Sequence, residues 1–207
     1  MKAQGCSNSS DVDNLLGNYR EIVASYSKRL NLVARRDVEN LLETLVLESL
    51  LPLSWNACRL ESPMIDIGSG AGIPGIPLRI ANPGLFVVLL DSNRRKTLFL
   101  RRAVEMLRLD GIVVVNQRAE QISQDPQYQG HFGTLVSRAT APVADLLRWG
   151  AELLKPGGEA IFWKGSSVVE EQAGLDATGW EGPDLWKHEG GLTLVRWVKA
   201  EASVDHN

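Results

Sequence analysis

Between residues 11 and 50, apolar side chains recur with the spacing of helices. In residues 11–30 they fall at every third or fourth position, which places them on one face of a helix. Asn31 follows, and asparagine readily adopts the left-handed conformation that ends helices. Asp37 can cap a second helix, whose apolar positions continue until Pro52. The pattern therefore predicts a helical N-terminal cap over residues 11–55.

After Pro63 the pattern changes to short apolar and β-branched runs, and helical stretches separate the first four of them. A helix at Pro142–Leu154 leads into the last run. The five runs are Met64–Ile67, Phe86–Leu90, Ile112–Val115, Thr134–Val136 and Ala160–Trp163. Alternation of strands and helices is typical of right-handed βαβ units, whose parallel strands are covered by helices on both faces.

The C-terminal part has a different pattern. Leu185–His188 and Leu192–Val198 are separated by Glu189-Gly190-Gly191, a sequence that favours a turn between two strands. We expect an antiparallel hairpin there. The whole pattern predicts an α/β protein with a Rossmann-like sheet that is mostly parallel, ends in this hairpin and is flanked by helices.

Length and composition are consistent with one folded domain. The 207 residues are 44% apolar and 23% charged, which is typical of a globular chain, and they are too few for two full-sized domains. We expect flexible ends at residues 1–10 and 201–207. The single domain then covers residues 11–200, with the cap at 11–55 and the α/β core at 56–200.

A glycine-rich stretch, Asp66-Ile-Gly-Ser-Gly-Ala-Gly-Ile-Pro-Gly75, follows the first predicted strand and enters a helix. Glycine lacks a Cβ, so a turn containing Gly70 and Gly72 lets a ligand approach the backbone closely. Asp91 ends the second predicted strand, where a carboxylate can accept hydrogen bonds from ribose hydroxyls. These features predict a cofactor that contains adenosine, bound at the ends of the first two strands.

The glycine spacing leaves two classes of cofactor open. Gly70-x-Gly72-x-x-Gly75 satisfies the dinucleotide fingerprint, so an NAD-dependent oxidoreductase is one interpretation. Asp66, however, stands two residues before Gly68. A carboxylate there suits the cationic methionine end of S-adenosylmethionine and would repel a pyrophosphate. The sequence therefore favours a methyltransferase, with dinucleotide binding as the alternative.

Two further segments follow predicted strands at the same edge of the sheet. Arg118-Ala119-Glu120 follows the third strand, where a loop would meet the adenine, and Ser137-Arg138-Ala139 follows the fourth, beside the transferring methyl group. Ligands of open α/β sheets bind outside the carboxyl ends of the strands, so both segments are candidate binding segments. Arg138 could instead cap a helix or pair with Glu120.

Charged residues are unevenly distributed, although the net charge is only −3. One acid, Glu105, and six basic residues lie between Ser92 and Arg108. The basic residues are Arg94, Arg95, Lys96, Arg101, Arg102 and Arg108. Such a segment can bind phosphate groups, or it can be the solvated face of a surface helix. The charge pattern alone does not decide between them.

Other residue patterns argue against several classes of protein. The two cysteines and three histidines are too scattered for a disulfide framework or a metal site, so we expect no metal. No run of 18 apolar residues occurs, which argues against a membrane-spanning helix and a membrane partner. The polar segment Met1–Asp13 does not resemble a secretory signal, so we expect a cytoplasmic protein.

In these motifs the chain closely resembles the bacterial 16S ribosomal RNA guanine-N7 methyltransferases (RsmG, formerly glucose-inhibited division protein B). Pro74 and Pro77 make the match of the glycine stretch more specific than that of a generic methyltransferase turn. The other matches are Asn31-Leu-Val-Ala-Arg-Arg-Asp37, Leu90-Asp-Ser92, Arg118-Ala-Glu120, Ser137-Arg-Ala139 and Trp163-Lys-Gly165. The similarity spans roughly residues 15 to 200.

The resemblance implies a class I methyltransferase that uses S-adenosylmethionine to methylate N7 of one guanine in 16S ribosomal RNA, leaving S-adenosylhomocysteine. The implied partner is the small ribosomal subunit, and we expect a monomer. The family's cofactor positions match Gly68, Ile73, Ala119, Glu120 and Arg138, and Asp66 and Asp91 fit the wider methyltransferase pattern. We assign RNA binding to Arg94, Arg95, Lys96, Arg118 and Lys164.

The implied reaction needs no general base, because guanine N7 carries a lone pair and no proton; Arg138 is therefore expected to position rather than to take a proton. The family usually has Arg-His-x-x-Asp-Ser where this chain has Thr44-Leu-Val-Leu-Glu-Ser49, so Leu45 replaces a histidine and Glu48 an aspartate. A catalytically silent RNA-binding protein is a further alternative. The helical cap could gate the substrate or complete the core.

Overall fold

A computed structural model describes residues 9–30, 32–33, 38–138, 140–165, 167–172 and 175–201. The helices are α1 (Ser9–Leu30), α2 (Val38–Ser49), α3 (Gly75–Ala81), α4 (Arg94–Met106), α5 (Ala119–Ile122), α6 (Val143–Leu153) and α7 (Val168–Glu171), with 3-10 turns η1 (Leu51–Leu53) and η2 (Glu189–Gly191). The strands are β1 (Met64–Ile67), β2 (Val87–Leu90), β3 (Ile112–Val115), β4 (Phe132–Arg138), β5 (Leu154–Lys164), β6 (Trp180–Lys187) and β7 (Thr193–Lys199).

Within the described residues the strands form one seven-stranded sheet in the order β3-β2-β1-β4-β5-β7-β6. The first five strands of this order pair in parallel, and β7 pairs antiparallel with both β5 and β6. The strand order therefore reverses direction between β1 and β4, where the chain crosses from one half to the other. The predicted α/β fold with a mostly parallel sheet and a C-terminal antiparallel hairpin is confirmed.

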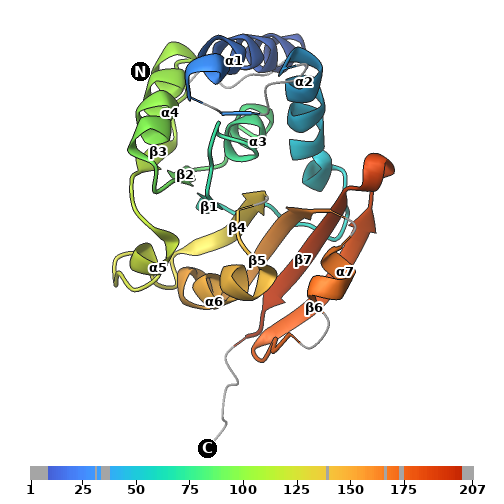
Figure 1. The fold of residues 1–207 in the computed structure, drawn as a ribbon. Helices are drawn as coiled ribbons and strands as arrows, with labels where there is room; N and C mark the ends of the chain where they lie inside the picture. Colours follow the sequence, from blue (N-terminus) through green and yellow to red (C-terminus); the bar gives the residue numbers. More distant parts are fainter. Residues whose placement is uncertain are drawn as a thin grey trace, which may run out of the picture.

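Helices cover both faces of the sheet. Figure 1 shows α1, α2, α3 and α4 grouped on one side and α5 and α6 on the other. Alternate residues of β1 point to opposite faces, as strand geometry requires: Met64 joins the first hydrophobic cluster, and Ile65 and Ile67 join the second. Where both faces are buried, as in β1 and β2, the strand is a largely apolar run, which is why the sequence predicted it well.

The helical cap completes the core of the first face. Tyr19 and Val23 of α1 and Leu42 of α2 have almost no exposed surface and belong to the same cluster as Met64. A hydrogen bond of 2.7 Å from the indole Nε1 of Trp163 in β5 to the carbonyl oxygen of Glu48 joins α2 to the sheet. Of the two roles considered for the cap, completing the core is the one that this packing supports.

The largest differences from the predicted elements are in β5 and β6. β5 begins at Leu154, directly after α6, whereas the sequence pattern predicted a start at Ala160. The prediction missed the first part of the strand because Lys155–Glu159 contain no apolar run. β6 begins at Trp180 rather than Leu185, and its exposed edge position leaves no hydrophobic pattern to detect. Asn31 and Asp37, the predicted helix stop and cap, lie outside the described residues, as do residues 1–8 and 202–207 of the expected flexible ends.

Candidate functional site

The glycine-rich stretch forms a tight turn between β1 and α3. The backbone amides of Gly68 and Ser69 donate hydrogen bonds to the carbonyl oxygen of Leu90, at 2.8 and 3.0 Å, so the turn is joined to the end of β2. Gly68 has a φ of 73°, and a Cβ there would lie 2.2 Å from Cγ2 of Thr140. Both the backbone conformation and the lack of space therefore require glycine at this position.

Asp91 at the end of β2 lies against the same turn. Its Oδ2 accepts a hydrogen bond of 3.0 Å from the amide of Gly70, and its Oδ1 accepts one of 2.7 Å from the amide of Asn93. The Asn116 side chain donates to the carbonyl oxygen of Asp91 at 2.9 Å. The carboxylate is thus oriented by backbone groups on both sides while it lines a cavity.

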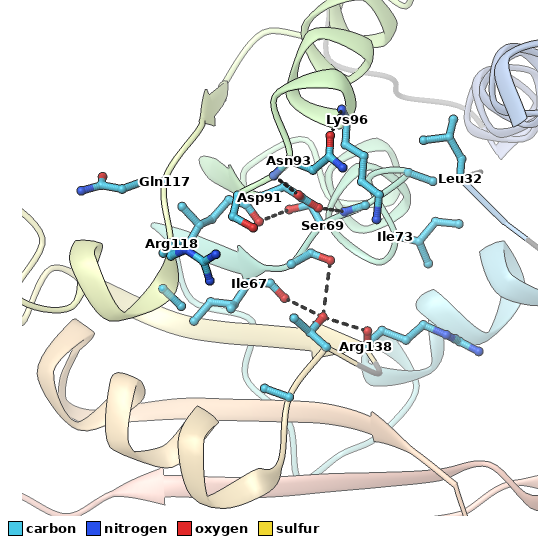
Figure 2. Close-up of a pocket in the computed structure, with 18 of the residues that line it drawn as sticks. Leu32, Ile67, Ser69, Ile73, Asp91, Asn93, Lys96, Gln117, Arg118 and Arg138 are labelled. Carbon is cyan, nitrogen blue, oxygen red and sulfur yellow. Dashed lines mark hydrogen bonds between the residues drawn. The ribbon is translucent and has the colours of Figure 1, made fainter. Parts of the chain in front are cut away.

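This cavity has a volume of about 640 Å³ and opens at the carboxyl ends of β1, β2 and β4 (Figure 2). Most of the residues predicted to bind the cofactor or RNA line it. They are Gly68, Gly70, Ile73, Asp91, Lys96, Arg118, Ala119, Glu120 and Arg138. The structure therefore brings together residues from four separate segments of the chain, as expected for the edge of a parallel sheet. Gly72, Asp66, Arg94, Arg95 and Lys164 do not line the cavity.

Residues of the helical cap also line the cavity, which we did not predict. Leu32, Val33 and Leu45 add apolar surface to its wall. The available signal was indirect, since Leu32 and Val33 lie inside the matched Asn31–Asp37 motif and Leu45 is one of the departures from the family pattern. Gln117, after β3, and Thr140, after β4, also line the cavity and were not predicted.

Asp66 is placed beneath the turn rather than in the cavity. It has no exposed surface, and its Oδ2 accepts a hydrogen bond of 3.0 Å from the amide of Gly75 at the start of α3. Its Oδ1 has no hydrogen-bond partner among the described residues. Burial raises the pKa of Asp66 to about 7. The expected contact of Asp66 with the positive end of a cofactor is not supported by this placement, because the side chain points to the α3 face of β1.

The predicted basic segment divides into two parts at the start of α4. Asn93 caps the helix by accepting hydrogen bonds from the amides of Arg95 and Lys96. Arg94 and Arg95 are exposed outside the cavity, whereas Lys96 is half-buried in its wall (Figure 2). Arg118, at the start of α5, is exposed and lines the cavity too. Arg94, Arg95, Lys96 and Arg118 together form a cationic rim along this side of the opening.

Arg138 ends β4 and points toward α2, away from Asp91 (Figure 2). Its Nη2 forms an ion pair and hydrogen bond with Oε2 of Glu48, and both side chains are mostly buried. Its Nη1 is buried without a hydrogen-bond partner among the described residues. The sequence-based alternative of a pair with Glu120 is wrong, since the partner comes from the helical cap instead.

Lys164, at the end of β5, is engaged by the protein. Its Nζ donates a hydrogen bond of 2.8 Å to the carbonyl oxygen of Ala141 and pairs with Glu171 at 3.1 Å. The side chain is 10% exposed. Glu171 in turn accepts a hydrogen bond of 2.6 Å from the amide of Val143, the first residue of α6. Lys164 therefore joins β5, α6 and α7, and its predicted contact with RNA phosphate would compete with Glu171.

In the described parts of the chain, no group of three or more His, Cys, Asp or Glu side chains could hold a metal ion. No described helix is long and apolar enough to cross a membrane.

The family model for the small-subunit ribosomal RNA methyltransferase G proteins (GidB) matches residues 13–179. The chain belongs to this family. The predicted resemblance is thereby confirmed, and the match decides between the methyltransferase and dinucleotide interpretations of the glycine turn in favour of the methyltransferase family.

Individual members of the family are also similar to this chain in sequence. The chain is 38% identical over 157 residues to ribosomal RNA small subunit methyltransferase G of Carboxydothermus hydrogenoformans, covering 76% of this chain and 66% of that protein. It is 37% identical to the protein of the same name from Stenotrophomonas maltophilia, covering 79% and 73%. The match spans slightly less than two thirds of the length of the former relative.

Solved structures show the same fold at low sequence identity. A predicted O-methyltransferase from Agrobacterium tumefaciens has a TM-score of 0.60 at 20% identity, covering 73% of this chain and 80% of that one. A tRNA (m1A58) methyltransferase from Aquifex aeolicus has a TM-score of 0.59 at 12% identity, covering 75% and 69%. These likenesses concern the arrangement of the sheet and helices.

Two of the departures from the family pattern, Leu45 and Glu48, lie at the site. Leu45 gives the cavity wall an apolar side chain where the family usually has histidine. Glu48 replaces an aspartate and carries the carboxylate that pairs with Arg138. A negative charge is thus retained at this position, on a side chain longer by one methylene group.

Proposed function

We propose that this chain transfers the methyl group of S-adenosylmethionine to N7 of a guanine in 16S ribosomal RNA of the small subunit. The observation that carries the proposal is the cavity, in which the glycine turn, the Asp91 carboxylate and the start of α5 meet in a member of a ribosomal RNA methyltransferase family. Its volume of about 640 Å³ lies within the range of roughly 300–1,000 Å³ usual for small-molecule sites.

The residues at the cavity suit the donor. A carboxylate offers about four acceptor positions, and two on Asp91 are used by the amides of Gly70 and Asn93. The others are available to the ribose hydroxyls. Ala119 and Glu120 at the start of α5 would flank the adenine, and Gly68 and Ile73 would hold the methionine end. Asp66 supports the turn from below.

When bound, S-adenosylmethionine supplies an electrophilic methyl group and becomes S-adenosylhomocysteine. Guanine N7 already has a free lone pair, so no side chain has to remove a proton. Accordingly, the described residues that line the cavity include no histidine or cysteine. The task of the protein is to align the acceptor with the methyl group and exclude water, an effect worth up to about 7–11 kcal/mol in well-oriented systems.

The pairing of Arg138 with Glu48 suits this reaction. Methylation at N7 makes the guanine ring positive, and an unpaired guanidinium beside it would oppose that change. Glu48 compensates the charge of Arg138, so the pair adds no net positive charge near the acceptor. Arg138 then acts by positioning, through hydrogen bonds to the donor or to an oxygen of the RNA.

The cationic rim would bind the RNA backbone. Arg94 and Arg95 are exposed, and Lys96 and Arg118 continue the positive charge into the cavity wall. Contacts of this kind give affinity with a strong dependence on salt, whereas a base splayed out of its stack supplies specificity.

The proposal is tested by methyl transfer to small ribosomal subunits from cells that lack the corresponding enzyme. Naked 16S RNA from the same cells is assayed in parallel, and the nucleosides are analysed by mass spectrometry. We expect new 7-methylguanosine with the wild-type chain and a strongly reduced amount with Asp91→Ala. Binding of S-adenosylmethionine without any new 7-methylguanosine would contradict the proposed acceptor, and absence of binding would contradict the proposed donor as well.

A further inference from the structure

Two buried polar side chains lie beneath the glycine turn, and one of them comes from the helical cap. Tyr19 of α1 and Asp66 of β1 both have no exposed surface. The hydroxyl of Tyr19 donates a hydrogen bond of 2.9 Å to the carbonyl oxygen of Ala71, and Asp66 accepts one of 3.0 Å from the amide of Gly75. The turn is therefore held at two backbone positions by side chains that do not line the cavity.

The peptide that Tyr19 holds is part of the cavity wall. Ala71 lies between Gly70 and Ile73, and all three residues line the cavity. The next residue, Gly72, has a φ of 97°, and its amide donates a hydrogen bond of 2.7 Å to the carbonyl oxygen of Ser69. The Ala71–Gly72 peptide is therefore held on its amide side by the turn itself and on its carbonyl side by Tyr19. Figure 1 shows α1 near α3, the helix that follows this turn. Removing the hydroxyl would leave a buried carbonyl group without this partner.

We infer that Tyr19 is a positioning residue for the donor site: through the carbonyl of Ala71 it holds the glycine turn in the shape that binds S-adenosylmethionine. The helical cap thereby takes part in donor binding without touching the donor. This inference rests on the proposed function. Apparent affinity falls in proportion to the fraction of molecules whose turn is competent to bind, so loosening the turn weakens binding without removing any direct contact.

The test compares Tyr19→Phe with a matched control on the same helix, Ser27→Ala. Tyr19→Phe keeps the aromatic ring in the core and removes only the hydroxyl. Ser27 is 2% exposed, and its hydroxyl donates a hydrogen bond of 2.7 Å to the carbonyl oxygen of Val23 within α1. Both variants remove one buried hydroxyl from α1, but only one of these hydroxyls reaches the turn.

Three measurements on the full chain separate positioning from stability. Titration calorimetry with S-adenosylmethionine should show a Kd about tenfold higher for Tyr19→Phe, equivalent to about 1.4 kcal/mol, and an unchanged Kd for Ser27→Ala. Hydrogen exchange without any ligand should be faster in peptides covering Gly68–Ile76 for Tyr19→Phe only. Thermal melts of both variants report the loss of stability.

Unchanged exchange in the turn and unchanged affinity for Tyr19→Phe would overturn the inference, as would equal weakening by both variants. Faster exchange with unchanged affinity would also overturn it, because the turn would then not need this shape to bind. If the wild-type chain does not bind S-adenosylmethionine while exchange responds as expected, the proposed function fails, and the role of Tyr19 in donor binding fails with it.

Discussion

Glu48 of α2 and Arg138 of β4 form an ion pair that joins the helical cap to the carboxyl edge of the sheet. The two side chains are 17% and 18% exposed, so the pair is largely removed from water. Trp163 strengthens the junction by donating a hydrogen bond to the main-chain oxygen of the same Glu48. One cap residue thus anchors both a strand of the sheet and a cationic side chain that lines the cavity.

Removing the charge of Glu48 should affect stability and catalysis together. Glu48→Gln leaves Arg138 partly buried without a counter-charge, and we expect a decrease of about 1–3 kcal/mol in the free energy of unfolding. Methyl transfer should fall more than donor affinity, because Arg138 is then no longer oriented by an ion pair. Urea denaturation and steady-state kinetics with small subunits measure the two effects.

A double-mutant cycle distinguishes the pair from two independent side chains. Arg138→Gln alone should lower methyl transfer by about 100-fold if misplacement of the acceptor is the cause. The double variant Glu48→Gln/Arg138→Gln should be destabilised by less than the sum of the single variants. Glu48→Asp, which restores the usual family residue, should lie between wild type and Glu48→Gln. Strict additivity of the changes in stability would show that the ion pair contributes nothing.

Asp91 should determine donor affinity. Asp91→Ala removes the acceptor for the amide of Gly70 and the proposed acceptor for the ribose, so the Kd for S-adenosylmethionine should rise about 10- to 100-fold. Asp110→Ala, which removes an exposed carboxylate before β3, serves as the control and should bind normally. Calorimetry measures the Kd of both variants. If Asp91→Ala binds S-adenosylmethionine as tightly as Asp110→Ala does, Asp91 does not contribute to donor binding.

The exposed arginines at the start of α4 should bind the RNA backbone. Reversing Arg94 and Arg95 to glutamate should weaken binding to small subunits and flatten its dependence on salt, by roughly 0.7–0.9 in the log–log slope for each phosphate that is no longer neutralised. Affinity for S-adenosylmethionine should stay the same. Arg148→Glu reverses an exposed charge on α6, at the opposite face, and should change neither quantity. An unaltered salt slope would show that Arg94 and Arg95 do not contact RNA phosphates and only form a solvated surface.

Asp66 should make stability depend on pH between about 4 and 7. Burial raises its pKa in the folded chain to about 7, whereas an unfolded chain has the ordinary value near 3.9. Between these pH values the folded chain retains a proton that the unfolded chain has released. The free energy of unfolding should therefore fall as pH rises through this window, by up to about 1.4 kcal/mol per pH unit, and level off above it.

Asp66→Asn keeps an oxygen for the amide of Gly75 and cannot titrate, so it lacks this dependence. Its stability relative to wild type should increase steadily from pH 4 to pH 7. Urea denaturation of both proteins across this range gives the comparison, and parallel curves would show that Asp66 does not titrate in this window.

Local patterns in the sequence determined most of the fold. Strands β1 and β2 and the middle of β4 are largely apolar because both faces of the sheet are buried there, and the glycine turn is recognisable because the positive φ values of Gly68, Gly70 and Gly72 favour glycine. These features depend on neighbouring residues, so they can be read along the chain. The same is true of Asp91, whose distance from Gly68 follows from the length of one βαβ unit.

Only the tertiary structure decided how distant side chains pair. Arg138 meets Glu48 across 90 positions, and Tyr19 meets Ala71 across 52, because the cap helices pack over α3 and against the edge of the sheet. Asp66 lies under the turn rather than in the cavity because alternate residues of β1 face opposite sides. Such contacts depend on how helices cross and which face a strand presents, and neither follows from residue types at a given spacing.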